Sequence, residues 1–178
     1  FGGVPFIYYG EEIGMQGAKP DENIRRPMQW TPEGGFSTGT PWKSYYEDYA
    51  TRNVTVQNTG ADSLLNHYRA LVALRNTDAA LRIGDWLPVR AKSRSVYSYV
   101  RFYGEEVVLV VINLSGQAVA DYTLTLDKGP LTADLQPAFL MGDGDLSMPP
   151  VNADGGFDAY RPIPVLPPYS STVIQFMP

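Results

Sequence analysis

The chain has no cysteine among its 178 residues. This excludes disulfide bonds, cysteine-ligated zinc and a cysteine nucleophile. No apolar run approaches the roughly 20 residues of a membrane-spanning helix, so we expect no membrane partner. Histidine occurs once, at His67, and a lone histidine without cysteines predicts a partly buried structural residue instead of a zinc ligand. We therefore expect neither a metal site nor a cofactor.

Basic residues are also scarce. The sequence has 14 Lys and Arg against 19 Asp and Glu, which gives a net charge of −5. Residues 1–84 carry a net charge of −1 and residues 85–178 carry −4. Neither half has the positive charge of a nucleic-acid-binding surface, so we expect no nucleic-acid partner. The balance of 44% hydrophobic and 19% charged residues is typical of a globular protein.

The first half combines an apolar run, a long irregular segment and a helix. Residues 6–9 follow Pro5 as a continuous apolar run, which is typical of a strand buried on both faces. Residues 10–60 show no sustained period, and long loops of this kind are often functional. Residues 62–76 show the spacing of an amphipathic helix, with Asp62 or Ser63 as its cap. We expect one buried stripe on that helix, formed by Leu64, Leu65, Tyr68, Leu71 and Val72.

The pattern changes to short strands after Gly84. Residues 96–102 alternate between two faces, residues 107–112 form a β-branched run, and residues 122–126 and 172–176 alternate again. Short strands separated by turn residues predict an antiparallel β-sandwich. We therefore predict a mainly β fold with a boundary between residues 1–84 and residues 85–178.

Five motifs occur in one order along the first half of the chain. They read GVPFIYYGEEIGM, KPDENIRRPMQW, TPW, SLLNHYRALVALRN and ALRIGDW. Their order resembles the α-amylase superfamily of glycoside hydrolases, and most closely its α-glucosidase, oligo-1,6-glucosidase and trehalose-synthase-like members. The resemblance covers about residues 2–112.

The resemblance implies an incomplete (β/α)₈ barrel followed by an antiparallel β-sandwich. Residues 3–10 would be the last barrel strand, residues 62–76 the last barrel helix, and residues 85–178 the sandwich. The strand would lack both neighbours, so we expect it to pair with a missing N-terminal part of the barrel or to self-associate. The family's catalytic carboxylates would lie before Phe1. The resemblance thus implies a retaining glycosidase whose fragment has no catalytic residue of its own and is inactive alone.

Glu11 and Glu12 follow the apolar run at the position where barrel enzymes carry out chemistry. Adjacent side chains on an extended chain point to opposite sides, so the two carboxylates cannot easily flank one bond. We expect instead that a carboxylate orders the long loop by accepting backbone or arginine hydrogen bonds.

The resemblance also implies a sugar-binding wall on the long loop. The segment RRPMQW matches an Arg-Thr-Pro-Met-Gln-Trp segment whose arginine holds a glucose unit, and this role falls on Arg25. Arg26 stands where the relatives have a small threonine. Trp30 and Trp42 are candidate platforms for α-glucan or maltooligosaccharide, as are two neighbouring tyrosines, Tyr45 and Tyr46. Structural roles in holding the loop remain open for all of these residues.

Two other functions remain open. The β half could be a non-catalytic carbohydrate-binding module, or the parent enzyme could be a transglycosidase. The segments at 142–145 and 152–156 faintly resemble calcium loops but lack the acidic pattern and the final glutamate, so they predict turns.

Overall fold

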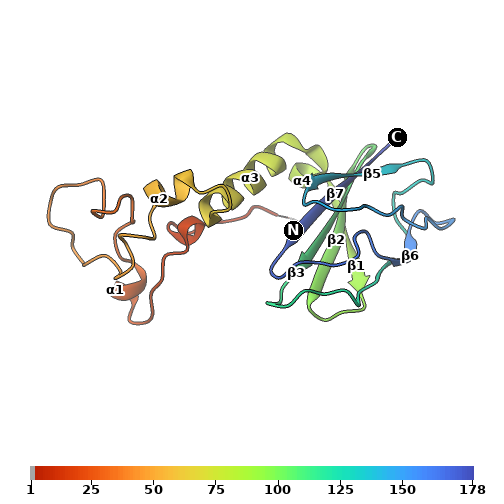
Figure 1. Ribbon diagram of the computed structural model, residues 1–178. Coiled ribbons are helices and arrows are strands. Elements are labelled where there is room, and N and C mark those ends of the chain that lie inside the picture. The colour runs from red at the N-terminus through yellow and green to blue at the C-terminus, as the bar shows by residue number, and fades with distance from the viewer. Residues whose placement is uncertain (1–2) are drawn as a thin grey trace. The chain divides into compact units, whose positions relative to one another are not determined.

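The computed structural model describes residues 3–178, and residues 1–2, which precede the first motif, lie outside the described part. The described chain divides into two compact units, Gly3–Ala73 and Leu74–Pro178. We call them the loop unit and the β unit, and each is drawn in Figure 1. The sequence predicted a boundary at residues 84–85, which stays a prediction for the domain organisation of the whole protein.

The β unit is built on a seven-stranded antiparallel sheet with the order β5-β7-β3-β2-β1-β4-β6 (Figure 1). Four of its strands were predicted from alternation or β-branched runs, and these four predictions are confirmed. The strands are β1 (Asp85–Ala91), β2 (Val96–Tyr103), β3 (Glu106–Asn113), β4 (Leu124–Leu126), β5 (Gln136–Met141), β6 (Phe157–Tyr160) and β7 (Ser171–Met177).

The central hairpin of β2 and β3 follows directly from its sequence. Tyr103 pairs with Glu106, so only Gly104 and Glu105 form the turn. Gly104 has a φ of 59°, which a glycine at the first central position of a two-residue hairpin turn adopts without steric cost. The β-branched residues of β3 then pair with β7 on its other edge.

The two faces of β2 are both buried, and each packs into a different cluster. Val96 and Val100 join the larger core, which also contains the alternating residues Tyr122, Leu124 and Leu126. Tyr99 faces the other side, where it packs with Ala80 and Leu81 of the short helix α4 (Ala79–Ile83). The helix therefore covers the face of the sheet that the larger core leaves open.

Helix α3 (Leu64–Thr77) confirms the helix predicted at residues 62–76, and α4 follows it as a separate short helix. Ser63 Oγ accepts a hydrogen bond from Asn66 N at 3.2 Å, which confirms Ser63 as a cap. Asp78 caps α4 by accepting from Leu81 N at 2.7 Å, and Gly84 follows its last residue. None of the described helices is long and apolar enough to cross a membrane.

The predicted buried stripe on α3 is wrong for most of its members. Leu65 is buried, but Leu64, Leu71 and Val72 are 40%, 36% and 46% exposed. His67 is exposed as well, not partly buried. Helical spacing identifies the apolar face of a helix, but burial also requires a partner surface, and no other part of the loop unit covers these side chains.

The strand predicted at residues 6–9 does not form in the described chain. These residues have no regular secondary structure, and Phe6 and Ile7 are 93% and 48% exposed. A strand forms only where a neighbouring strand completes its backbone hydrogen bonds, and no described residue of the loop unit does so. The loop unit otherwise holds a 3₁₀ turn (Glu11–Ile13) and the short helices α1 (Asp21–Ile24) and α2 (Val54–Thr59).

Candidate functional site

The adjacent carboxylates of Glu11 and Glu12 both accept hydrogen bonds from the backbone of the turn that precedes them. Glu11 Oε2 accepts from Tyr8 N at 3.3 Å, and Glu12 Oε2 accepts from Gly10 N at 2.8 Å. Gly10 has a φ of 90°, and a Cβ there would meet the Met15 sulfur. The expectation that a carboxylate orders this loop by accepting backbone hydrogen bonds is confirmed for both residues.

Arg25 lies at the end of α1 with its side chain 61% exposed. Its Nη2 atom donates to Asp21 Oδ2 at 3.1 Å, across one turn of the same helix. Exposed pairs at this spacing contribute little to stability. The guanidinium is therefore accessible to a ligand, and its contact with Asp21 does not tie α1 to a distant segment.

Arg26 contacts the chain about 20 residues further on. Its Nη1 atom donates to Ser44 O at 2.7 Å, Ser44 Oγ at 3.0 Å and Tyr45 O at 3.1 Å. Its Nη2 atom donates to Asn23 Oδ1 at 3.3 Å, and the guanidinium carbon lies 5.8 Å from the Tyr46 ring centre. The two adjacent arginines thus differ, because only Arg26 joins separate parts of the loop unit.

The two candidate tryptophans are both accessible. Trp30 is 41% exposed, its backbone N donates to Gly34 O at 2.8 Å, and its ring meets Phe36 edge-on at 6.4 Å. Trp42 is 63% exposed. Tyr45, the next aromatic side chain along, lies against Tyr49 at 5.4 Å between ring centres. Each tryptophan therefore presents an apolar surface to which a sugar ring can bind.

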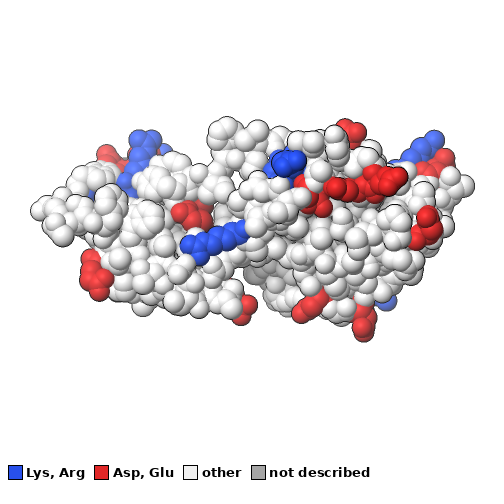
Figure 2. Space-filling view, turned by 90° about the horizontal axis from the view of Figure 1, so that it is seen from above, with Lys and Arg blue, Asp and Glu red and all other residues white. Residues whose placement is uncertain are grey.

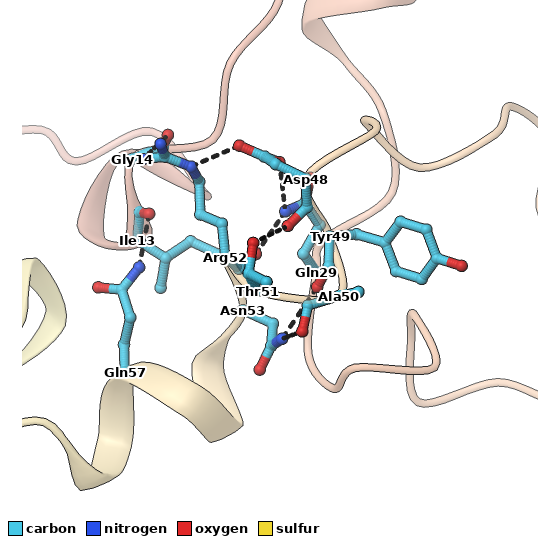
Figure 3. Close-up of polar contacts among 10 residues, drawn as sticks. All are labelled: Ile13, Gly14, Gln29, Asp48, Tyr49, Ala50, Thr51, Arg52, Asn53 and Gln57. Carbon is cyan, nitrogen blue, oxygen red and sulfur yellow. Dashed lines mark hydrogen bonds and ion pairs between the residues drawn. The ribbon is translucent and has the colours of Figure 1, made fainter.

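A polar cluster that the sequence analysis missed supports this loop (Figure 3). Arg52 Nε pairs with Asp48 Oδ2 at 2.5 Å, and Arg52 Nη1 donates to Gly14 O at 3.0 Å. Gln29 is fully buried, and its Nε2 atom donates to Asp48 Oδ1 at 3.3 Å. The only sequence signal for the cluster is the four-residue spacing of Asp48 and Arg52, which is common to many surface ion pairs.

Two amides extend the cluster toward α2. Asn53 is fully buried, accepts from Val56 N at 2.9 Å and donates to Tyr49 O at 2.9 Å. Gln57 donates to Ile13 O at 2.7 Å and accepts from Leu65 N at 3.1 Å. Irregular backbone at 13–15 and 48–53 is thus held by side-chain hydrogen bonds where no helix or strand supplies them.

Charge gives the loop unit little further chemistry. Among the described residues no group of three or more His, Cys, Asp or Glu could hold a metal ion. On the face drawn in Figure 2, Lys and Arg side chains form no continuous basic area. Partial burial raises the pKa of Tyr9, and its neighbour Tyr8 adds to this effect.

The β unit has a cleft of its own, of about 620 Å³. It is lined by the turn at 142–145, the segment at 163–167 and the start of β7. Asp143, Asp145, Ser171 and Thr172 are among its lining residues, and its described lining includes no aromatic residue.

Comparison with known proteins relates the first half of the chain to a protein family. A family model described as "Alpha amylase, catalytic domain" matches residues 1–84. Alpha-amylase 3 of Dictyoglomus thermophilum is 36% identical over 115 residues, which cover 64% of this chain and 23% of that protein. The oligo-1,6-glucosidase of Halalkalibacterium halodurans is 32% identical over 153 residues, which cover 65% of this chain and 27% of that enzyme.

A solved structure matches almost the whole chain. The crystal structure of trehalose-6-phosphate hydrolase from Bacillus licheniformis has a TM-score of 0.73 and 24% identity, and the match covers 99% of this chain and 36% of that one. A likeness at this identity concerns the fold alone. The chain spans about a quarter of the length of these two curated relatives and about a third of this structure.

Proposed function

The chain carries a region of the α-amylase superfamily of glycosidases, and on that premise we propose that it forms one wall of the sugar pocket of a retaining α-glucan-active enzyme. The observation that carries the proposal is the loop unit itself. It presents Arg25, Trp30 and Trp42 with accessible side chains on a loop held by side-chain hydrogen bonds, including those of the buried Gln29. A guanidinium binds sugar hydroxyls, and indole faces bind the apolar faces of sugar rings.

The proposal assigns the catalytic carboxylates to a part of the enzyme outside these 178 residues. A retaining mechanism needs two carboxyl groups about 5–5.5 Å apart across the scissile bond. In the described part of the chain, the adjacent pair Glu11 and Glu12 accepts backbone hydrogen bonds of its own turn. We therefore expect the 178-residue chain alone to be inactive.

Exposed apolar side chains support a missing partner for the loop unit. Large apolar side chains are exposed to solvent near both ends of the loop unit's sequence, at residues 4–9 and along α3. Phe6 is 93% exposed and its neighbours Val4 and Ile7 are exposed as well, and a contiguous apolar stretch of this kind marks an interaction surface. We propose that the remainder of the catalytic barrel covers them and that residues 3–10 become its last strand. Without it, the same surface would promote association between copies.

We also propose that residues 85–178 form a second domain, an antiparallel β-sandwich that stabilises the barrel. The pairing of β1 supports the sandwich, because the strand pairs with β2 over residues 85–89 and with β4 over residues 90–91. A strand that changes partner along its length can pass from one sheet to the other. The larger core contains buried residues from both groups of strands, including Leu109 of β3 and Phe157 of β6.

Substitution of the tryptophans in the active polypeptide tests the proposal. We expect Trp30→Ala or Trp42→Ala to raise the KM for maltotriose by roughly tenfold, about 1.4 kcal/mol of lost sugar contact. We expect Arg25→Ala to do the same through lost hydrogen bonds. Trp86→Ala is the matched control, since this tryptophan is 39% exposed but lies in β1. An unchanged KM for all three loop variants would overturn the proposed pocket wall.

The assay also separates the two remaining functions. Chromatography of the products distinguishes hydrolysis from transfer to a second sugar. A non-catalytic binding module would instead bind maltooligosaccharide through the β unit. Its cleft has carboxylates and hydroxyls, but the absence of an aromatic residue from the described lining favours the loop unit as the sugar site.

A further inference from the structure

We propose that Arg26 is a positioning residue, which sets the place of the sugar-binding loop through Tyr45. The inference rests on the proposed function and gives Arg26 a role in holding the loop that the sequence left open. Arg26 spans from the end of α1 to residues 44–46, where its guanidinium donates to Ser44 and Tyr45 at 2.7–3.1 Å. The backbone oxygen of Arg26 in turn accepts from Tyr9 Oη at 3.1 Å. One residue thus joins three segments that are distant in sequence.

Tyr45 passes this constraint on to the turn that carries Trp30. The Tyr45 ring lies so close to Gly34 and Gly35 that a Cβ at either glycine would stand 2.4 Å from a ring carbon or the hydroxyl. Gly34 has a φ of 124° and pairs with Thr31 in an isolated bridge. Gly34 O also accepts from Trp30 N at 2.8 Å. A shift of Tyr45 therefore moves the backbone that presents the Trp30 ring.

The geometry requires an arginine at this position. Its planar fork reaches Ser44 and Tyr45 with one nitrogen and Asn23 with the other. A lysine has a single ammonium group and cannot span both sides.

Hydrogen exchange of the 178-residue chain tests the clamp without any sugar. We expect Arg26→Ala and Arg26→Lys to speed exchange of the Tyr49, Thr51 and Arg52 amides, which donate to Tyr46 O and Asp48 O, by on the order of tenfold, because the loop that holds these acceptors opens more readily without the arginine. Arg25→Ala is the matched control and should leave exchange there unchanged, since Arg25 pairs within α1. Equal exchange in Arg26→Ala and the unchanged chain, or the same acceleration in Arg25→Ala, would overturn the clamp.

A second readout connects the clamp to the sugar. In a chain with Trp42→Phe and Trp86→Phe, Trp30 is the only tryptophan. We expect Arg26→Lys to increase acrylamide quenching of Trp30 and, in the active polypeptide, to raise the KM for maltotriose without lowering kcat. A lowered kcat at unchanged KM would contradict a positioning role. Failure of the proposed function would leave KM insensitive to Trp30→Ala while the exchange result stands, so the two failures are distinguishable.

Discussion

Glu106 ties helix α4 to the sheet, and its removal tests how the β unit is held together. Its Oε2 atom accepts from Ala79 N at 3.1 Å and from Ala80 N at 3.2 Å, the first two amides of α4. Ala80 is fully buried, so water cannot readily replace the carboxylate. In Glu106→Ala the Ala79 amide loses its acceptor, the Ala80 amide keeps only Asp78, and the helix loses a favourable negative charge at its N-terminus.

The magnitude follows from these contacts. Hydrogen bonds to a charged group contribute about 1.5–3 kcal/mol to stability. Part of this loss of stability is offset at Asp78. Burial raises the pKa of the Asp78 carboxyl and the nearby charge of Glu106 raises it further, so removing Glu106 relieves a repulsion between the two carboxylates. We therefore expect Glu106→Ala to lower the free energy of unfolding by about 2 kcal/mol, and Glu106→Gln by about half as much because the amide oxygen still accepts.

Urea unfolding of the 178-residue chain, followed by circular dichroism, measures the effect. Glu105→Ala is the control, because this neighbouring carboxylate is exposed in the hairpin turn. Surface substitutions of that kind usually change stability by about 0.5 kcal/mol or less. If Glu106→Ala falls within the same range as Glu105→Ala, then the helix is held by its apolar contacts alone and the reasoning is refuted.

Two further predictions concern a glycine and a buried tyrosine. Gly34→Ala should unfold the loop around Tyr45, because its Cβ would stand 2.4 Å from the ring and the φ is 124°; proteolysis of residues 30–46 should accelerate, and unchanged resistance would contradict the contact. Tyr122 Oη donates to Ile163 O at 2.8 Å, and burial raises its pKa to about 12. The stability that the protonated Tyr122 contributes is therefore fully present below about pH 10 and is lost between pH 10 and 12. Tyr122→Phe should destabilise the β unit by about 1 kcal/mol at pH 7 and reduce the loss of stability between pH 10 and 12; an unchanged alkaline slope would contradict this origin.

The sequence best predicted elements that pair with a neighbour close to them in the chain. The hairpin of β2 and β3 was predictable because alternation, a β-branched run and Gly104 all indicate it. Strands β1 and β5 were missed because Pro88 and Pro137 interrupt their patterns. Both prolines are tolerated because β5 is at the edge of the sheet and β1 pairs on only one side at Pro88.

Elements that depend on distant partners were predicted less well. The apolar run at 6–9 and the stripe on α3 were read correctly as apolar, but the described loop unit provides no surface to bury them. The support of the candidate site was not predictable either, because Gln29, Asp48 and Arg52 meet only through the folded loop. The roles of Arg25, Trp30 and Trp42 remain predictions from motif order.

The most direct test is to recover the natural polypeptide that contains this sequence, using an antibody against the β unit. Its mass is measured by light scattering, and its activity is measured on an α-glucoside. We predict a polypeptide, or an assembly of polypeptides, well above 19.7 kDa that turns over the α-glucoside, and no turnover by the 178-residue chain alone. Turnover by a 19.7 kDa species, or a larger species without activity on any α-glucoside, would contradict the account.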